Sequence, residues 1–152
     1  YDNVNVIEFS GPHGRVTFPF RRIEQLKDVA PEDYEVSDKL TYVTHIFPNV
    51  ILAELSHHMT LGILEPMGTD RTKITSYHMT KPTDAEGKDA AIADAKRDFA
   101  FVSETGQHED IALVTSIQSS IGSGANDVFT FGHFEPAIVH FHQHMARMIA
   151  DI

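Results

Sequence analysis

Apolar and polar residues alternate along the beginning of the chain. The alternation runs through residues 3–9 and again through residues 16–20, and a Gly-Pro-His-Gly sequence at residues 11–14 separates the two segments. Alternation of this kind puts successive side chains on opposite faces of a strand, and glycine with proline marks a turn. The pattern therefore predicts a β-hairpin.

The middle of the chain predicts an antiparallel meander. Four segments rich in β-branched and aromatic residues follow one another: 40–47, 50–55, 59–64 and 73–79. Such a composition is typical of strands. Pro48 interrupts the first pair, where we expect a turn, and the adjacent polar residues His57 and His58 predict a solvated turn before the third segment. His78, inside the last segment, is expected to form a hydrogen bond within the sheet.

The second half of the chain changes to a helical period. Residues 85–102 are rich in alanine and residues 109–120 also have helical spacing, so we expect two helices there. A third helix is predicted from Glu135 to the end of the chain, with Pro136 in its first turn, where a missing N–H costs nothing. Its apolar residues recur every three or four positions and form one stripe: Ile138, Phe141, Met145, Met148 and Ile152. These elements predict an α+β fold in which a curved antiparallel sheet wraps around a long C-terminal helix.

Composition and charge limit the function. With 152 residues, 41% of them hydrophobic, the chain fits a single domain spanning residues 1–152. Its 22 acidic against 12 basic residues give a net charge of -10, which would repel nucleic acid. No apolar run approaches the roughly 20 residues that span a bilayer, and the first residues do not resemble a signal peptide, so we expect no membrane contact and a cytoplasmic protein. The start on Tyr1 rather than Met indicates a piece of a longer protein.

The absence of cysteine excludes thiolate chemistry and cysteine-held metals in this segment. A metal would need His, Asp or Glu as ligands. His140 and His144 have i, i+4 spacing on the last predicted helix and could chelate a divalent ion. Without a third inward ligand, however, ordinary surface or rim histidines are the better interpretation. Neither a phosphate-binding loop nor a serine-nucleophile motif is present.

The carboxylates Glu109 and Asp110 form the sharpest candidate site. If a helix begins at Glu109, Asp110 lies on its apolar side and points into the core. That side also carries Leu113, Val114 and Ile117. A buried carboxylate needs a metal or a positive partner, because its desolvation is costly. The alternative is that both carboxylates are simply first-turn residues favoured by the helix dipole, and the residues alone leave both interpretations open.

Several motifs together resemble one enzyme family. Five stretches carry them: 11–14, 46–49, 66–72, 109–118 and 131–142. The fourth holds Glu109 and Asp110, with Gln118 eight residues after the aspartate. In this order and at roughly this spacing, they resemble the C-terminal catalytic part of the alpha subunit of Rieske non-haem iron oxygenases of the aromatic-ring-hydroxylating type. The resemblance covers nearly the whole chain and rests on collinear motifs rather than on one decisive motif.

The resemblance implies a helix-grip fold, of the START and Bet v1 type, around a mononuclear Fe(II) held by two histidines and one carboxylate. The carboxylate position matches Asp110, with Glu109 as the alternative one residue away. The two histidines, and the Rieske domain with its [2Fe-2S] cluster, would lie upstream of this chain. We therefore expect the chain alone to be inactive and to bind iron weakly or not at all.

The same resemblance implies the terminal component of a mono- or dioxygenase, which takes electrons from a ferredoxin or reductase and uses O2 to hydroxylate an organic, aromatic or apolar substrate. The complete enzyme would be a homotrimer or an alpha3beta3 assembly. From the residues themselves, His45 and Asn49 flank the Phe47-Pro48 break. We therefore expect one or both to make polar contacts in an apolar pocket between the sheet and the last helix, with Phe101 as a wall. Ordinary packing is the alternative for all three residues. For the function, the alternatives are a non-catalytic helix-grip module that binds an apolar small molecule and a degenerate interaction subunit.

Overall fold

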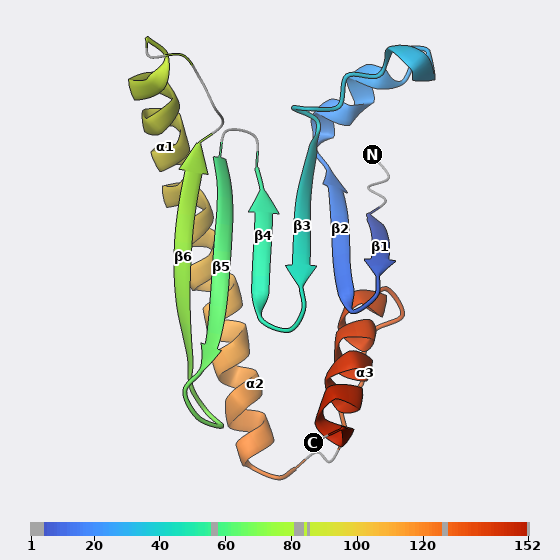
Figure 1. Cartoon of the computed structure of the whole chain (residues 1–152), viewed down its shortest axis with the longest axis vertical. Helices are drawn as coiled ribbons and strands as arrows, with labels where there is room; N and C mark the ends of the chain where they lie inside the picture. Colours follow the sequence, from blue (N-terminus) through green and yellow to red (C-terminus); the bar gives the residue numbers. More distant parts are fainter. Residues whose placement is uncertain (1–4, 56–57, 81–83, 85, 126–127, 152) are drawn as a thin grey trace.

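Six strands form one antiparallel sheet in which each strand pairs with the next along the chain (Figure 1). A computed structural model describes residues 5–55, 58–80, 84, 86–125 and 128–151, with the side chains of residues 101, 102, 105, 107 and 108 outside the description. The strands are β1 (Val6–Ser10), β2 (His13–Pro19), β3 (Leu40–Ile46), β4 (Val50–Glu54), β5 (His58–Pro66) and β6 (Thr72–Thr80). Two short 3-10 helices, η1 (Arg21–Leu26) and η2 (Pro31–Asp33), lie between β2 and β3. The predicted hairpin and meander are therefore confirmed.

The turns between strands follow the glycine and proline signals. Gly11, in the β1–β2 turn, has a φ of 56°, a conformation that glycine adopts without the strain a side chain would add. The β3–β4 turn contains Pro48, as predicted, and the Phe47–Pro48 peptide bond is cis. The backbone N–H of Phe47 donates a hydrogen bond to His13 Nδ1 at 3.1 Å, which ties this turn to the first hairpin.

Three helical segments run on from one another after β6. They are α1 (Lys88–Gly106), a π-helical turn η3 (Gln107–Ile111) and α2 (Ala112–Gly122). The two predicted helices are therefore confirmed as α1 and α2. The π-helical turn joins them without a break, because Gly106 keeps helical angles of φ -60° and ψ -37° and no proline stands nearby to end the helix.

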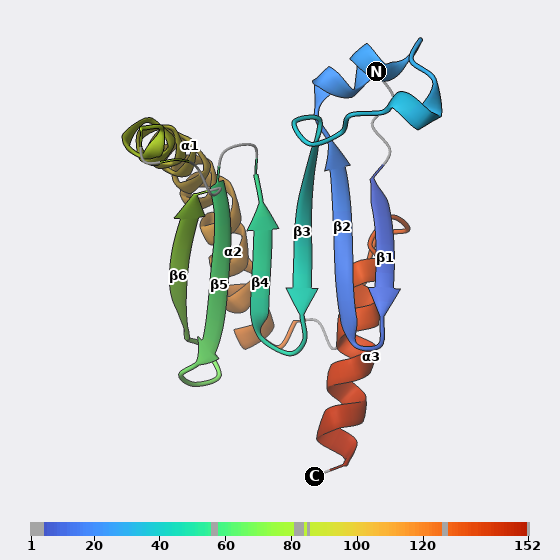
Figure 2. The same ribbon diagram turned by 45° about the horizontal axis from the view of Figure 1, so that its top comes forward.

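Both α1 and the last helix, α3 (Pro136–Ala150), cover the same face of the sheet (Figure 2). Backbone pairing aligns Ile7 of β1, through the intervening strands, with His78 of β6. Phe9, two residues from Ile7, shares its face because side chains alternate along a strand. The Phe9 ring stacks on His140 of α3, and His78 packs against Phe99 of α1. This arrangement confirms the expected α+β helix-grip fold.

The two helices leave the middle of that face open. Leu26 and Ala95, each 8% exposed, are the least exposed apolar side chains in the described part of the chain. Ile51 of β4 and Ile74 of β6, which point to the helix-bearing face, are 38% and 56% exposed. The apolar face is therefore covered along its two edges, while its centre remains accessible to solvent.

His58 differs most from its expected environment. It is 1% exposed and lies in β5, paired with Thr80, rather than in a solvated turn. Its Nδ1 atom lies 3.8 Å from an Asp98 carboxylate oxygen on α1. The helix packed over the end of the strand buries His58, and no local pattern reports that packing. His57 lies outside the described residues, whereas the expected hydrogen bond of His78 is confirmed, with Nδ1 3.0 Å from the Thr60 hydroxyl.

None of the helices within the described segments combines the length and the apolar character needed to cross a lipid bilayer.

Candidate functional site: an apolar pocket and a carboxylate turn

Helix α3 begins as the sequence predicts. Pro136 occupies the first turn, Glu135 is the N-cap residue, and its carboxylate accepts a hydrogen bond from the backbone N–H of Gly132. The predicted apolar stripe faces the sheet, and four of its five members line one pocket: Ile138, Phe141, Met145 and Met148. Ile152, the fifth, lies outside the described residues.

Aromatic rings hold α3 against the sheet. The rings of Phe9 and His140 stack with centroids 4.0 Å apart and planes inclined by 15°. The next residue of α3, Phe141, meets the His45 ring edge-to-face with centroids 5.0 Å apart and the tilted Phe47 ring at 5.9 Å. Stacked and edge-to-face rings of this kind add to the stabilisation from apolar burial. The start of α3 is therefore fixed against β1 and β3.

The α3 pocket, with a volume of about 660 Å³, lies between this helix and the ends of strands β3 to β6 next to the β3–β4 and β5–β6 turns. Its wall is formed by His45, Pro48, Asn49, Ile51, Leu64, Pro66, Thr72, Ala137, Ile138, Phe141, Met145 and Met148. A largely apolar cavity with a few polar groups is the usual form of a small-molecule site. Pro66 and Thr72, at the ends of β5 and β6, were not expected as pocket residues. The adjacency of β4 and β5, which puts Leu64 beside Asn49, is the signal that could have located them.

His45 and Asn49 are brought together in this pocket, as expected. His45 Nε2 lies 3.3 Å from the carbonyl oxygen of Pro48. Asn49 Nδ2 donates a hydrogen bond to the carbonyl oxygen of Leu64 at 3.0 Å, and the Asn49 carbonyl accepts one from the Leu64 N–H at 2.9 Å. Phe101 belongs to α1, but its side chain lies outside the description, so its expected role as a wall is not tested.

Loss of hydration lowers the pKa of His144, on the sheet side of α3. The neighbouring His140, Arg147 and His13 lower the pKa further, because each disfavours a second positive charge. The rings of His140 and His144 have centroids 4.5 Å apart. His144 therefore packs best here in its neutral form.

Glu109 and Asp110 both lie in the π-helical turn η3 and both are exposed. The expectation that Asp110 points into a core was wrong, because no described element covers this side of the helix. Leu113, Val114 and Ile117, which follow in α2, are 59%, 54% and 43% exposed. The first-turn explanation fails as well, because the helix begins at Lys88 and a dipole effect fades within the first turn. Single π-turns occur frequently at functional sites.

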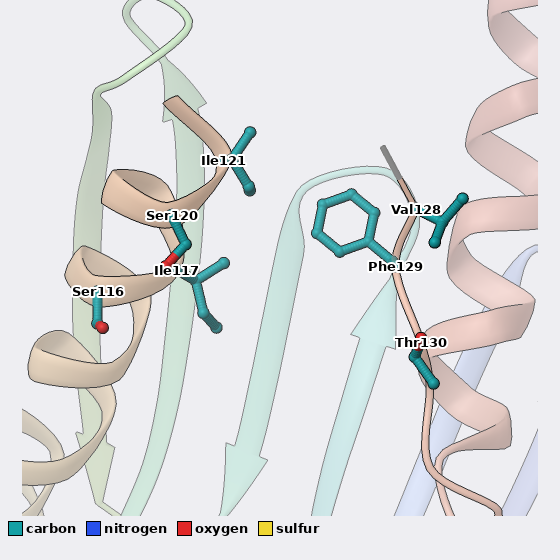
Figure 3. Close-up of a pocket in the computed structure, with 7 residues that line it drawn as sticks. All are labelled: Ser116, Ile117, Ser120, Ile121, Val128, Phe129 and Thr130. Atoms are coloured by element: carbon teal, nitrogen blue, oxygen red, sulfur yellow. The ribbon is translucent and has the colours of Figure 1, made fainter. Parts of the chain in front are cut away.

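A second, smaller hollow lies along α2. This α2 cleft, of about 520 Å³, separates one side of the helix from the extended segment 128–130. In Figure 3 the ring of Phe129 and the side chains of Ile117 and Ile121 point toward one another across it. Gln118 Nε2 donates a hydrogen bond to the Thr69 carbonyl at 3.4 Å and so connects α2 to the β5–β6 hairpin. The α2 cleft begins at Ser116, six residues after Asp110.

Comparison with protein families identifies the chain. A family model described as the ring hydroxylating alpha subunit (catalytic domain) matches residues 4–151. The chain belongs to this family. Searches among the curated proteins and among the solved structures give no match. Ring-hydroxylating alpha subunits are the terminal oxygenase components of Rieske systems, which in general use a mononuclear iron, a Rieske cluster, electron-transfer partners and a multimeric assembly.

The donor groups of this chain fit the family's iron in part. The carboxylates of Asp110 and Glu109 are oxygen ligands of the kind that iron accepts, and both are accessible. Within the segments that the structure describes, no three His, Asp or Glu side chains are grouped so as to hold a metal ion. The π-turn can therefore contribute one carboxylate ligand, and the remaining ligands would come from outside the described groups.

Proposed function

We propose that this chain forms the C-terminal, substrate-binding part of the catalytic domain of a Rieske oxygenase alpha subunit, which hydroxylates an organic, aromatic or apolar substrate with O2. The observation that carries the proposal is the family match over residues 4–151. The apolar α3 pocket supports it, because a volume of about 660 Å³ lies within the range of small-molecule sites. The residue span 1–152, taken as one such part within a longer cytoplasmic protein, belongs to the same proposal.

Asp110 is the proposed carboxylate ligand of mononuclear Fe(II), with Glu109 as the alternative. Two histidines from the upstream part of the complete protein would complete the ligand set. Bound there, Fe(II) would supply the centre at which dioxygen is taken up and activated. The part played by this chain is to hold one carboxylate on a helix and to keep the substrate in a mostly apolar cavity, where water competes less.

The partners belong to the same proposal. Electrons would pass from a ferredoxin or reductase to the [2Fe-2S] cluster of the upstream Rieske domain and from there to the iron. The complete enzyme would be a homotrimer or an alpha3beta3 assembly. The isolated chain would then be inactive, since it carries only one of the proposed iron ligands.

A non-catalytic helix-grip module that binds an apolar small molecule is the second candidate function. The α3 pocket favours it, because His45, Asn49 and the apolar wall form a cavity without any contribution from Asp110. In that case the pocket would bind its ligand with no iron in the protein.

Iron and sulfide analysis of the longest natural form of the protein, purified without oxygen, tests the oxygenase proposal. We expect a Rieske cluster by visible absorption and one further iron per chain. Asp110→Ala should lose the further iron and keep the cluster, whereas Glu109→Ala and the matched control Glu104→Ala, at an exposed carboxylate on α1, should keep both.

Each other outcome has a distinct meaning. Loss of iron only in Glu109→Ala would move the ligand by one residue. Retention of iron in both Asp110→Ala and Glu109→Ala would contradict the proposed ligand role of the π-turn. A colourless, iron-free wild-type protein would reject the oxygenase and leave the binding module.

A further inference from the structure

Two of the three polar side chains that line the α3 pocket lie on one short segment, and the third, Thr72, lies at the start of β6. His45 comes from the end of β3 and Asn49 from the β3–β4 turn, four residues later. The opposite wall is apolar and consists of Ile138, Phe141 and Met145 on α3. A ligand in this pocket would therefore meet polar atoms on one side only, and the hydrogen-bonding state of those atoms would decide which ligands fit.

The tautomer of His45 follows from its neighbour. His45 Nε2 lies 3.3 Å from the Pro48 carbonyl oxygen, which can only accept a hydrogen bond. Nε2 must therefore carry the hydrogen, and in a neutral imidazole the other nitrogen, Nδ1, is then an acceptor. Within the described part of the chain, no group donates a hydrogen bond to His45 Nδ1.

The orientation of Asn49 follows in the same way. Its side chain lies 3.0 Å from the Leu64 carbonyl, so the contacting atom is the amide nitrogen and the oxygen, Oδ1, is on the other branch. The backbone hydrogen bond from the Leu64 N–H to the Asn49 carbonyl, at 2.9 Å, holds the residue in place. Nothing among the residues described donates to Asn49 Oδ1, whereas one amide N–H remains able to donate.

We infer that the α3 pocket selects apolar, ring-sized molecules that carry an O–H or N–H donor over equally apolar molecules that lack one. The inference rests on the proposed function, in which this pocket holds the substrate, and it narrows the substrate class. A ligand that covers these two acceptors without donating to them binds less tightly, because it displaces their water and leaves them without a partner. One neutral hydrogen bond corresponds to a preference of about 3- to 10-fold.

Three naphthalenes of similar size provide the test. Naphthalene has no polar group, 2-methoxynaphthalene has an acceptor oxygen only, and 2-naphthol has the same oxygen with a donor hydrogen. Dissociation constants would be measured by equilibrium dialysis, with all compounds at the same pH. We expect 2-naphthol to bind about 3- to 10-fold more tightly than either of the other two compounds.

Two variants remove the acceptors. His45→Phe keeps a ring against Phe141 but has no nitrogen, and Asn49→Leu keeps the approximate size without the amide. Each variant should reduce the preference for 2-naphthol. Thr44→Val is the matched control, since Thr44 precedes His45 on the same strand but points to the opposite face, so the preference should persist.

Several results would overturn the inference. Equal affinity for naphthalene and 2-naphthol would show that the pocket does not prefer a ligand with a hydrogen-bond donor. Equal affinity for 2-methoxynaphthalene and 2-naphthol would show that the oxygen accepts from the protein instead. Binding of none of the three compounds would also reject it, whereas the loss of iron in Asp110→Ala depends on a different residue, so the two proposals can fail independently.

Discussion

Two helices on the same face of the sheet differ in how they meet it. On α3 the apolar stripe packs onto the strands, with Phe141 contacting His45 at 5.0 Å and Phe47 at 5.9 Å. On α2 the apolar side chains remain exposed, from 43% at Ile117 to 59% at Leu113. The same kind of spacing therefore produces a docked helix in one place and an open apolar surface in the other.

The difference lies in what stands opposite each helix. Opposite α3, the rings of Phe9 on β1, His45 on β3 and Phe47 in the next turn each contact a ring of the helix. On the side of α2, Gln118 donates a hydrogen bond to the Thr69 carbonyl, and the α2 cleft separates the helix from residues 128–130. An apolar stripe thus determines which side of a helix can pack against another element. Whether such an element is present depends on other parts of the fold.

The largest predicted effect comes from weakening the packing of α3 on the sheet. Phe141→Ala removes a half-buried ring that contacts His45 and Phe47 on the sheet side and lines the α3 pocket. We therefore expect the free energy of unfolding to fall by about 2 kcal/mol, below the range for a fully buried ring. Leu113→Ala on α2 is the matched control. Its exposed side chain should change the stability by less than about 0.5 kcal/mol.

Urea unfolding of the 152-residue chain, followed by circular dichroism, measures both changes. Equal losses in the two variants would mean that α2 is packed as firmly as α3. A negligible loss in Phe141→Ala would mean that the rings at the start of α3 do not hold it to the sheet.

The sheet and α3 could be predicted from the sequence because their signals are local. Alternation located the strands to within a few residues, and Pro48 and Pro136 marked a turn and a helix start where the structure has them. The positions of His45 and Asn49 in the pocket followed from the same strand pattern. In each case, nearby residues contain the information that decides the local structure.

The rest depends on contacts between distant segments. The two predicted helices are joined by a π-turn that no residue pattern announces. His58 looked like a turn residue until α1 was seen to bury it. The periodicity around Asp110 identified the correct companions, Leu113 and Ile117, yet it could not report that nothing described covers them. The family resemblance, by contrast, was confirmed by the match over residues 4–151.

The stability of the chain is expected to depend on pH through His144 on α3. The pKa of His144 is lowered from its ordinary value of about 6.5 by loss of hydration, and then by His140, Arg147 and His13. The folded chain therefore binds fewer protons at this site than the unfolded chain, so stability is full above about pH 6.5 and falls as the pH drops through the lowered pKa. We expect the urea midpoint to decrease between about pH 7 and pH 5.

His144→Gln should flatten this pH dependence, because it removes the group that titrates. His133→Gln, at an exposed histidine before α3, is the control and should leave the slope as it is in the wild type. An unchanged slope in His144→Gln would assign the effect to other groups on the sheet side of α3.

The smallest predicted effect concerns the two edges of the sheet, each of which carries a cross-strand ion pair. Glu8 accepts from Arg15 Nε and Nη2 at 3.0 and 2.6 Å, and Glu65 accepts from Lys73 at 2.9 Å. Arg15→Met and Lys73→Met should each lower the melting temperature by only about 1 °C, because exposed pairs gain little.

The stabilisation from the second pair also decreases as the pH falls, as at His144, but the electrostatic cause is the opposite. At Glu65 the charged form is favoured, whereas at His144 it is disfavoured. The hydrogen bond from Lys73 lowers the pKa of Glu65 below its ordinary 4.5, so the small stabilisation is present above that value and is lost as the pH falls through the lowered pKa. Thermal melts of wild type and Lys73→Met should therefore converge as the pH falls below this lowered pKa, and also in about 1 M salt, where screening acts over only a few ångströms. A difference that survived both conditions would have to come from the packing of the lysine stem against β5 rather than from its charge.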